Sequence, residues 1–265
     1  MEWYAAYLML GAIAGFLAGM FGVGGGLVLV PVLLFLFDSQ QFPAEHVMLL
    51  ALGTSMAAIL FTSLASLREH HRHSAVNWRV VRNITPGILL GTGIGASLAA
   101  SIPTRGLAIF FSLFMYAVAA QILLTMRPHA SRQLPGATGM TLAGMLTGCL
   151  SSLVSIGGGS IVVPFLVWCN IPLRNAIGTS AAIGFPVAIG GTIGYVVTGF
   201  SVPALPTHSL GFIYLPALSW ISLASIITAP LGAKATHQMK VGLLRKLFAL
   251  LLLALATKLL LKVLA

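Results

Sequence analysis

The chain has 265 residues, of which 58% are hydrophobic and only 7% are charged, and its mean hydropathy is +1.02. Soluble domains are about 25% charged, so this composition excludes an ordinary water-soluble protein and indicates a chain that lipid solvates. The net charge of +10 lies in short basic clusters between long apolar runs. That pattern is typical of membrane loops and argues against nucleic-acid binding.

The first elements in chain order are Trp3 and Tyr4, which precede the first apolar run. No basic residue occurs before Arg68, so the start does not resemble a cleavable signal peptide. We expect the two aromatic side chains to anchor the chain at a membrane interface instead.

Eight apolar runs follow, at about 5–37, 44–67, 80–101, 106–126, 136–169, 173–198, 210–235 and 242–264. A membrane-spanning helix needs about 20 apolar residues, so six of these runs predict one span each. The first and fifth runs are too long for one span. Each is interrupted by glycines and then a proline, at residues 22–26 with Pro31 and at 157–159 with Pro164. Because glycine disfavours helix, we expect both runs to break into two half-helices.

The two halves of the chain share a pattern of small residues. Gly11, Gly15, Gly24 and Pro31 recur 133 residues later as Gly144, Gly148, Gly157 and Pro164. Gly53-Thr54-Ser55 recurs after 125 residues as Gly178-Thr179-Ser180, and Gly95-Ala96 and Phe111 recur after 137 as Gly232-Ala233 and Phe248. The sequence therefore predicts two membrane repeats, 1–130 and 131–265, within one structural unit. Repeats with interrupted segments are typical of transporters.

The distribution of basic residues favours one topology. If every run crossed once, 8 Lys and Arg would lie inside and 6 outside. If each glycine-broken run returns to its own side, the counts become 11 and 3, as the positive-inside rule requires. The sequence thus predicts an all-α polytopic membrane helical bundle of two inverted repeats. Each repeat has one hairpin-like segment plus three spanning helices, and both termini lie outside a bacterial inner membrane. The second limb of each hairpin is short, at about 12 residues.

The glycine pattern resembles a known signature. G-x3-G-x2-G-x-G-G-G-x4-P at Gly15 to Pro31 is similar to the signature of the TauE/SafE family of anion transporters. The second copy ending at Pro164 and the two Gly-Thr-Ser triplets are similar as well, so the resemblance covers nearly the whole chain. It implies transport of sulfite, sulfonates or a related sulfur-containing anion. The second copy departs from the first, because Ser152 and Ser155 replace Gly19 and Gly22.

An anion inside the membrane needs hydrogen-bond donors, and no Lys or Arg lies in the middle of a run. Half-helices that begin after Gly26 and at Ser160 would present free N–H groups and positive dipole ends, which bind anions. The candidate substrate-binding residues are Gly24, Gly25, Gly26, Thr54, Ser55, Gly157, Gly158, Gly159, Ser160, Thr179 and Ser180. Glycines also serve helix packing, the preferred role for Gly11, Gly15, Gly144 and Gly148. The Thr and Ser hydroxyls can instead bond to their own helix.

The remaining polar residues suggest no cofactor and no metal. The carboxylates Glu2, Asp38, Glu45 and Glu69 lie at run ends or in loops, so no buried proton relay is available. An interior-negative potential favours anion export by about 2.3 kcal/mol per charge per 100 mV, so we expect efflux.

Cys149 and Cys169 are expected to be packed thiols. The His-rich cluster at 68–73 is expected to be a headgroup-facing loop, with metal binding and pH gating as alternatives. His46, His208 and His237 lie near run ends and look interfacial.

Two other functions compete with transport. An intramembrane enzyme would need a catalytic constellation, but the sequence contains no H-E-x-x-H motif and no paired aspartates. A membrane assembly factor would not need glycine breaks at equivalent positions. The preferred interpretation is a transporter, not an enzyme, whose partners are a small anionic substrate and the lipid bilayer. No nucleic acid is expected, and homo-oligomer formation is left open.

Overall fold

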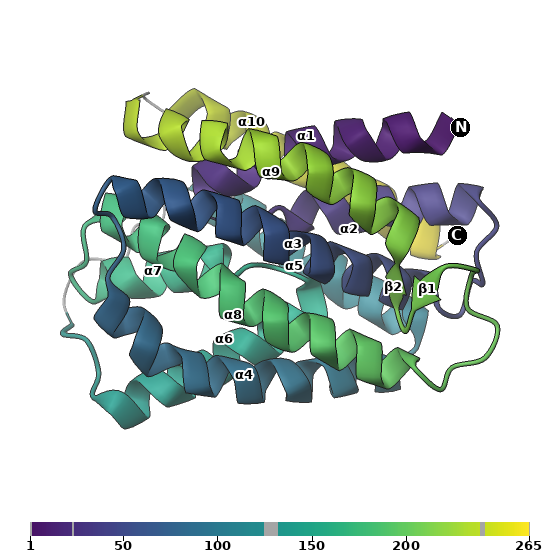
Figure 1. Cartoon of the computed structure of the whole chain (residues 1–265), viewed down its shortest axis with the longest axis horizontal. Coiled ribbons are helices and arrows are strands. Elements are labelled where there is room, and N and C mark those ends of the chain that lie inside the picture. The colour runs from purple at the N-terminus through teal and green to yellow at the C-terminus, as the bar shows by residue number, and fades with distance from the viewer. Residues whose placement is uncertain (1, 23, 125–131, 239–241, 265) are drawn as a thin grey trace.

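The computed structural model describes residues 2–22, 24–124, 132–238 and 242–264. These residues form ten helices and one short hairpin of strands (Figure 1). The helices are α1 (Glu2–Phe21), α2 (Gly26–Ser39), α3 (Val47–Arg72), α4 (Trp78–Ser101), α5 (Thr104–Leu123), α6 (Ala137–Val154), α7 (Gly159–Trp168), α8 (Leu173–Gly199), α9 (Leu215–Gln238) and α10 (Gly242–Leu264). The strands β1 (Ser209–Leu210) and β2 (Ile213–Tyr214) pair antiparallel. Eight of the described helices are long and apolar enough to cross a membrane, which confirms a polytopic helical bundle. They include α1 and α6, which were expected to be half-helices, so among the described helices only the second limbs α2 and α7 are shorter than a span.

Both long apolar runs break where the glycines lie, as predicted. The break between α1 and α2 places Gly25 at φ 84°, and the break between α6 and α7 places Gly158 at φ 85°. Only glycine adopts this left-handed conformation without steric cost, so the glycines fix the position of each break. The second limbs are short: α2 has 14 residues and α7 has 10. α7 begins at Gly159, one residue before the predicted Ser160.

Each broken segment returns to the end of the bundle at which it starts. α1 begins, and α2 ends, at the end where the two termini lie, at the right of Figure 1. Two contacts fix this end: Gln40 Nε2 donates to Tyr7 OH at 2.7 Å, and Lys262 Nζ lies 2.7 Å from Asp38 Oδ2. α6 begins and α7 ends at the opposite end, where Arg132 N donates to Trp168 O at 3.2 Å.

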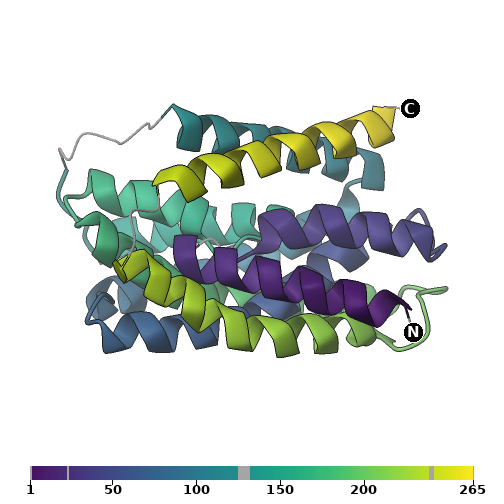
Figure 2. The same cartoon turned by 90° about the horizontal axis from the view of Figure 1, so that it is seen from above.

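The packing partners in one half of the chain repeat in the other. The central helices α3 and α8 pack against each other, α1 packs on α9, and α6 packs on α4. The partner of α2 is α3, just as the partner of α7 is α8. α5 and α10 pair with each other along one side, at the top of Figure 2.

Four glycines serve close helix packing, the role preferred for them from sequence. A Cβ built on Gly11 would lie 2.5 Å from Ile221 O, and one on Gly15 would lie 2.6 Å from Ser225 Cα. The corresponding glycines of α6, Gly144 and Gly148, would meet backbone atoms of α4 in the same way. Small residues thus let the membrane helices approach backbone to backbone.

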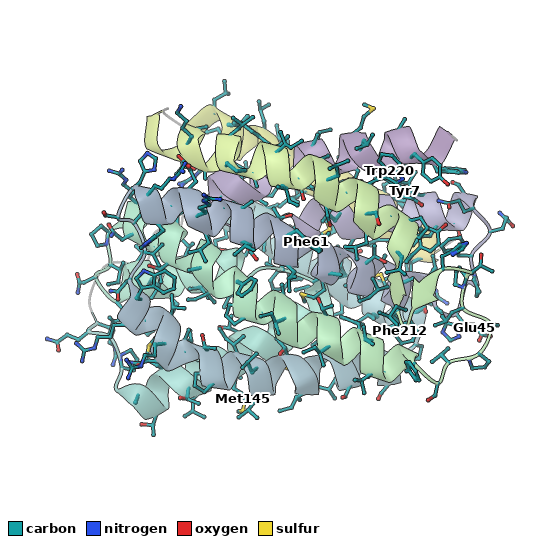
Figure 3. The ribbon with its side chains drawn as sticks, viewed as in Figure 1. Tyr7, Glu45, Phe61, Met145, Phe212 and Trp220 are labelled. Atoms are coloured by element: carbon teal, nitrogen blue, oxygen red, sulfur yellow. The ribbon has the colours of Figure 1, made fainter. Side chains whose placement is uncertain are left out.

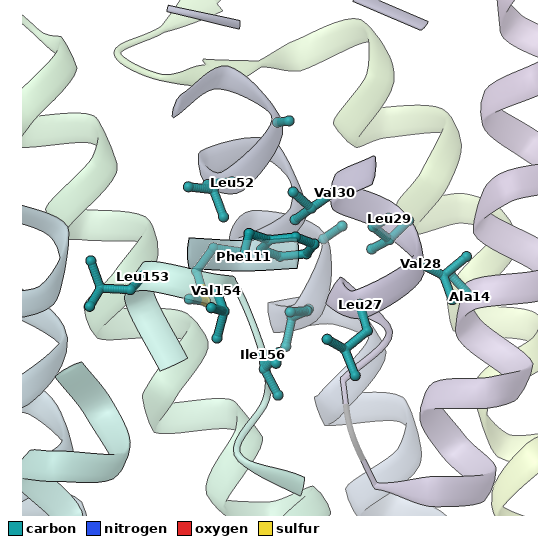
Figure 4. Close-up of a cluster of buried hydrophobic side chains, with 14 of the residues drawn as sticks. Ala14, Leu27, Val28, Leu29, Val30, Leu52, Phe111, Leu153, Val154 and Ile156 are labelled. Atoms are coloured by element: carbon teal, nitrogen blue, oxygen red, sulfur yellow. The ribbon is translucent and has the colours of Figure 1, made fainter. Parts of the chain in front are cut away.

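The half-helices are held by apolar packing inside the bundle. Leu27 and Val30 of α2, Phe111 of α5, and Val154 and Ile156 beside the second break are all fully buried (Figure 4). Large apolar side chains also cover the outer faces of the spanning helices (Figure 3), as a lipid-facing surface requires.

The carboxylates with described side chains lie towards the ends of the bundle. Glu45 lies at the end that holds the termini (Figure 3), and Asp38 lies there too, bonded to Lys262. Glu69 lies in the last turn of α3, 3.7 Å from Arg72 Nη1. Among the described side chains, therefore, no carboxylate occupies the middle of a span.

Candidate functional site

The two glycine breaks touch each other at the centre of the bundle. A Cβ built on Gly24 would lie 2.7 Å from Gly157 N and 2.8 Å from Gly157 Cα. A Cβ built on Gly157 would lie 3.0 Å from Gly24 Cα. The two backbones are therefore in direct contact, and neither position has room for a side chain. Two segments that lie 133 residues apart in sequence meet here.

A half-helix begins immediately after each break. The amides of Val28 and Leu29 both donate to Gly25 O at 3.0 Å. Those of Ile161 and Val162 donate to Gly158 O at 3.0 and 2.7 Å. The N–H groups that precede them in each first turn have no partner within their own helix, and the positive end of the helix dipole lies here. The two breaks therefore bring potential anion donors close together.

Two of the predicted hydroxyls have structural partners instead. Thr54 Oγ1 accepts from Tyr214 N at 2.9 Å, and Thr179 Oγ1 accepts from Asn77 N, also at 2.9 Å. Each threonine thus fixes the backbone at the start of a neighbouring spanning helix, α9 or α4. This arrangement gives both threonines a role in holding the fold.

The predicted serines differ from one another. Ser180 Oγ donates to Gly22 O at 3.4 Å, so it supports the first break from α8. Ser55 Oγ and Ser160 Oγ are buried and have no hydrogen-bond partner within the described part of the chain. Of the described hydroxyls in the two Gly-Thr-Ser triplets, only that of Ser180 therefore bonds a glycine break.

A small cavity lies beside the contact between the breaks. Its volume is about 10 Å³, roughly the space that one water molecule requires. The lining residues are Ala18, Gly22, Gly24, Thr62, Ser63, Ser66, Gly157, Ala181 and Gly184. This volume is too small for an oxoanion with four or more heavy atoms, which would fit here only if the helices around the cavity moved apart.

Only two of the predicted site residues, Gly24 and Gly157, line this cavity. The later glycines of each triplet face away from it: Gly26 packs on the carbonyl of Ser155, and Gly158 faces the side chains of Val162 and Ile183. The first glycine of each triplet therefore borders the space. The second, Gly25 or Gly158, turns the chain with a left-handed φ, and the third begins the half-helix.

The sequence interpretation missed the hydroxyl groups of α3. Thr62, Ser63 and Ser66 line the cavity, although none of them belongs to a repeated motif. Their signal in the sequence is three hydroxyls within five residues of an apolar run. Other spanning helices also carry serines and threonines, for example Ser151 and Ser152 of α6, so this signal by itself does not single out the cavity.

The histidine cluster is partly buried, which corrects the expectation of a headgroup-facing loop. Residues 68–72 continue α3, and the side chain of His70 is fully buried, with Nε2 3.2 Å from Gly19 O. His71 Nδ1 accepts from Trp78 Nε1 at 3.3 Å, and His73 Nδ1 lies 3.0 Å from Glu69 O. Over the described residues, no group of three His, Cys, Asp or Glu could hold a metal ion.

The sequence also matches known proteins. The profile of the family described as "Sulfite exporter TauE/SafE" matches residues 7–259. A "Probable membrane transporter protein" of Haemophilus influenzae is 38% identical over 256 residues, which cover 96% of this chain and 97% of that protein. A protein of Methanocaldococcus jannaschii with a similar name is 27% identical over 237 residues, or 87% of this chain and 85% of its own. No solved structure matches. The chain therefore belongs to the TauE/SafE sulfite exporter family.

Proposed function

We propose that this protein transports a small, sulfur-containing anion of the sulfite or sulfonate class, which binds where the two glycine breaks meet. The contact of Gly24 with Gly157 beside a cavity carries this proposal, because it brings two half-helix N-termini to one place. The name of the matching family supports the substrate class, and the names of the relatives support membrane transport. The protein is accordingly a transporter, not an enzyme.

Backbone groups supply the attraction for the anion. Each helix N-terminus carries roughly half a positive elementary charge together with unpaired N–H groups. None of the residues that line the cavity is charged. Anion binding at the N-termini of broken helices is a recurrent device in transporters, and it needs no lysine or arginine at the site.

The two halves are inverted repeats across the membrane, and both termini face outward. The opposite directions of the two broken segments support this topology (Figure 1), as do the basic residue counts of 11 inside and 3 outside. In this orientation the connection between α3 and α4 faces the cytoplasm of a bacterial inner membrane. The interior-negative potential then drives the anion outward by about 2.3 kcal/mol per charge per 100 mV.

Flux measurements with purified protein in proteoliposomes test the function. The panel is sulfite, thiosulfate, organic sulfonates and carboxylates, each measured with and without an imposed membrane potential. Sulfite or a sulfonate should move fastest, and its exit should accelerate when the compartment of origin is negative. Absence of flux for every anion in the panel would refute transport, and equal flux at all potentials would refute potential-driven efflux.

A matched pair of glycine variants links this flux to the breaks. Gly158→Ala places a residue with a Cβ at a left-handed φ of 85°, which is sterically unfavourable. The variant should reduce flux about tenfold or more while the protein stays folded. Gly93→Ala is the control, because a Cβ at Gly93 meets nothing within 4 Å. Equal flux for the two variants would show that the break is unrelated to transport.

A further inference from the structure

The hydroxyls of the cavity lie on one face of α3. Ile59, Thr62, Ser63 and Ser66 follow the i, i+3, i+4, i+7 spacing that places side chains on the same side of a helix. Ile59 lies nearest the glycine contact, since its Cγ2 is 3.2 Å from the Cβ position of Gly24. The three hydroxyl residues continue from there towards the connection with α4. We call Thr62, Ser63 and Ser66 the hydroxyl face.

The corresponding face of α8 has no hydroxyls. At the offset of 125 residues, Thr62, Ser63 and Ser66 correspond to Val187, Ala188 and Gly191. Space at that face is also filled, because the Sδ of Met56 lies 3.0 Å from the Cβ position of Gly191. The hydroxyl face is thus a feature of one side of the glycine contact, and the backbone symmetry does not require it.

The hydrogen bonding of the hydroxyl face is incomplete. Ser66 is only 2% exposed and lines the cavity, yet its Oγ has no partner within the described residues. Among the described residues, Ser63 Oγ bonds no other element and donates to Leu60 O of its own helix, at 3.1 Å. A buried hydroxyl that is left unpaired destabilises the fold, and a ligand that accepts its hydrogen bond would remove that cost. The chemistry of such a ligand is that of an oxyanion.

We propose that Ser63 and Ser66 donate hydrogen bonds to the transported anion, and that the hydroxyl face selects monovalent over divalent oxoanions. This inference rests on the transport function proposed above. Thr62 has a supporting role, because its hydroxyl bonds both Ala58 O at 2.9 Å and Ser225 Oγ at 3.0 Å. The bond to Ser225 holds α3 against α9 at the level of the cavity.

The selection for a single charge follows from desolvation. The free energy of removing an ion from water rises with the square of its charge, so a dianion costs about four times as much as a monoanion. Hydroxyls and helix dipoles are neutral or fractional donors, and no charged side chain lines the cavity. Such donors can offset the desolvation cost of a monoanion far better than that of a dianion. Hydrogensulfite and organic sulfonates fit this requirement, and sulfate does not.

A double variant tests the inference, with a matched control. Ser63→Ala combined with Ser66→Ala removes both donors, and it should raise the KM for an organic sulfonate about tenfold. Ser222→Ala is the control, because Ser222 Oγ is also buried and unpaired but does not line the cavity. Its KM should equal that of the wild type. Size-exclusion profiles in detergent establish that each variant is folded.

A second measurement reports binding without transport. In a protein lacking Cys149 and Cys169, Ser66→Cys is treated with a negatively charged thiol reagent while the sulfonate concentration is raised. The sulfonate should slow the labelling of Cys at position 66, sulfate should not, and Ser222→Cys should not respond to either. Normal wild-type flux together with an unchanged KM in the double variant and no protection would overturn this inference alone. Failure of the wild type to move any anion would overturn the proposed function itself.

Discussion

His70 on α3 and Tyr195 on α8 make the same kind of contact in the two halves of the chain. His70 Nε2 lies 3.2 Å from Gly19 O, and Tyr195 OH donates to Ser152 O at 2.7 Å. The two side chains are 125 residues apart in sequence, and the two carbonyls are 133 apart. Each side chain ties a central helix to the end of the helix that precedes a glycine break.

The Tyr195 bond should contribute measurably to stability. Tyr195→Phe keeps the ring but leaves the buried Ser152 carbonyl without its hydroxyl donor, which should lower the free energy of unfolding by about 1–3 kcal/mol. Thermal unfolding in detergent measures this as a lower Tm. Tyr116→Phe is the matched control, because its hydroxyl bonds Thr257 Oγ1 at the exposed surface. Equal Tm values for the two variants would contradict the structural role of Tyr195.

The glycine contact should not tolerate even a methyl group. Gly24→Ala combines a left-handed φ of 81° with a Cβ 2.7 Å from Gly157 N. Displacing that backbone should cost about 3 kcal/mol or more, with a loss of flux of at least about tenfold. Gly93→Ala should instead leave Tm unchanged or raise it, because its Cβ faces open space in α4. Wild-type stability and flux in Gly24→Ala would refute the contact.

Ile59 should act as a barrier beside the glycine contact, one turn of α3 before the hydroxyl face. It is fully buried, with Cγ2 near the Cβ positions of both Gly24 and Gly157, at 3.2 and 3.5 Å. Ile59→Ala should lower stability by about 2–5 kcal/mol and increase leak of preloaded sulfonate from proteoliposomes. Ile94→Ala, a change on the lipid-facing surface, should do neither. If the Ile59→Ala protein leaks sulfonate no faster than the wild type, the barrier lies elsewhere.

Selection for a monoanion predicts a specific dependence on pH. Hydrogensulfite loses its proton near neutral pH and becomes a dianion, whereas an organic sulfonate keeps one charge throughout. Between about pH 6 and about pH 8, sulfite flux should therefore fall, and sulfonate flux should stay constant. A parallel decline of the two fluxes would attribute the effect to the protein instead of the substrate.

The topology has its own test. A periplasmic reporter enzyme fused after the last residue should be active, because α10 ends at the outward-facing end in the proposed orientation. A fluorescent reporter that matures only in the cytoplasm should not fluoresce when it is fused after the last residue. It should fluoresce when it is inserted between α3 and α4. The reverse pattern would overturn the orientation of the bundle.

Much of the fold was predictable because its signals are local. Runs of about 20 apolar residues predicted the spanning helices, and the glycine clusters predicted the ends of α1 and α6 within a few residues. The hairpin form of the two long runs followed from the distribution of Lys and Arg along the sequence. All three depend on properties that a residue or a short segment carries by itself, namely hydrophobicity, backbone freedom and charge.

The sequence by itself thus determined where the long apolar helices lie and where the two longest runs break. Only the tertiary structure decided that Thr54 and Thr179 bond the starts of α9 and α4, while Ser66 lines the cavity with no partner in the described part of the chain. The residues next to these hydroxyls in the sequence do not predict that their roles differ. Their roles differ because each is set by which backbone from a distant segment lies within hydrogen-bond distance of it, and that depends on the packing of the whole bundle.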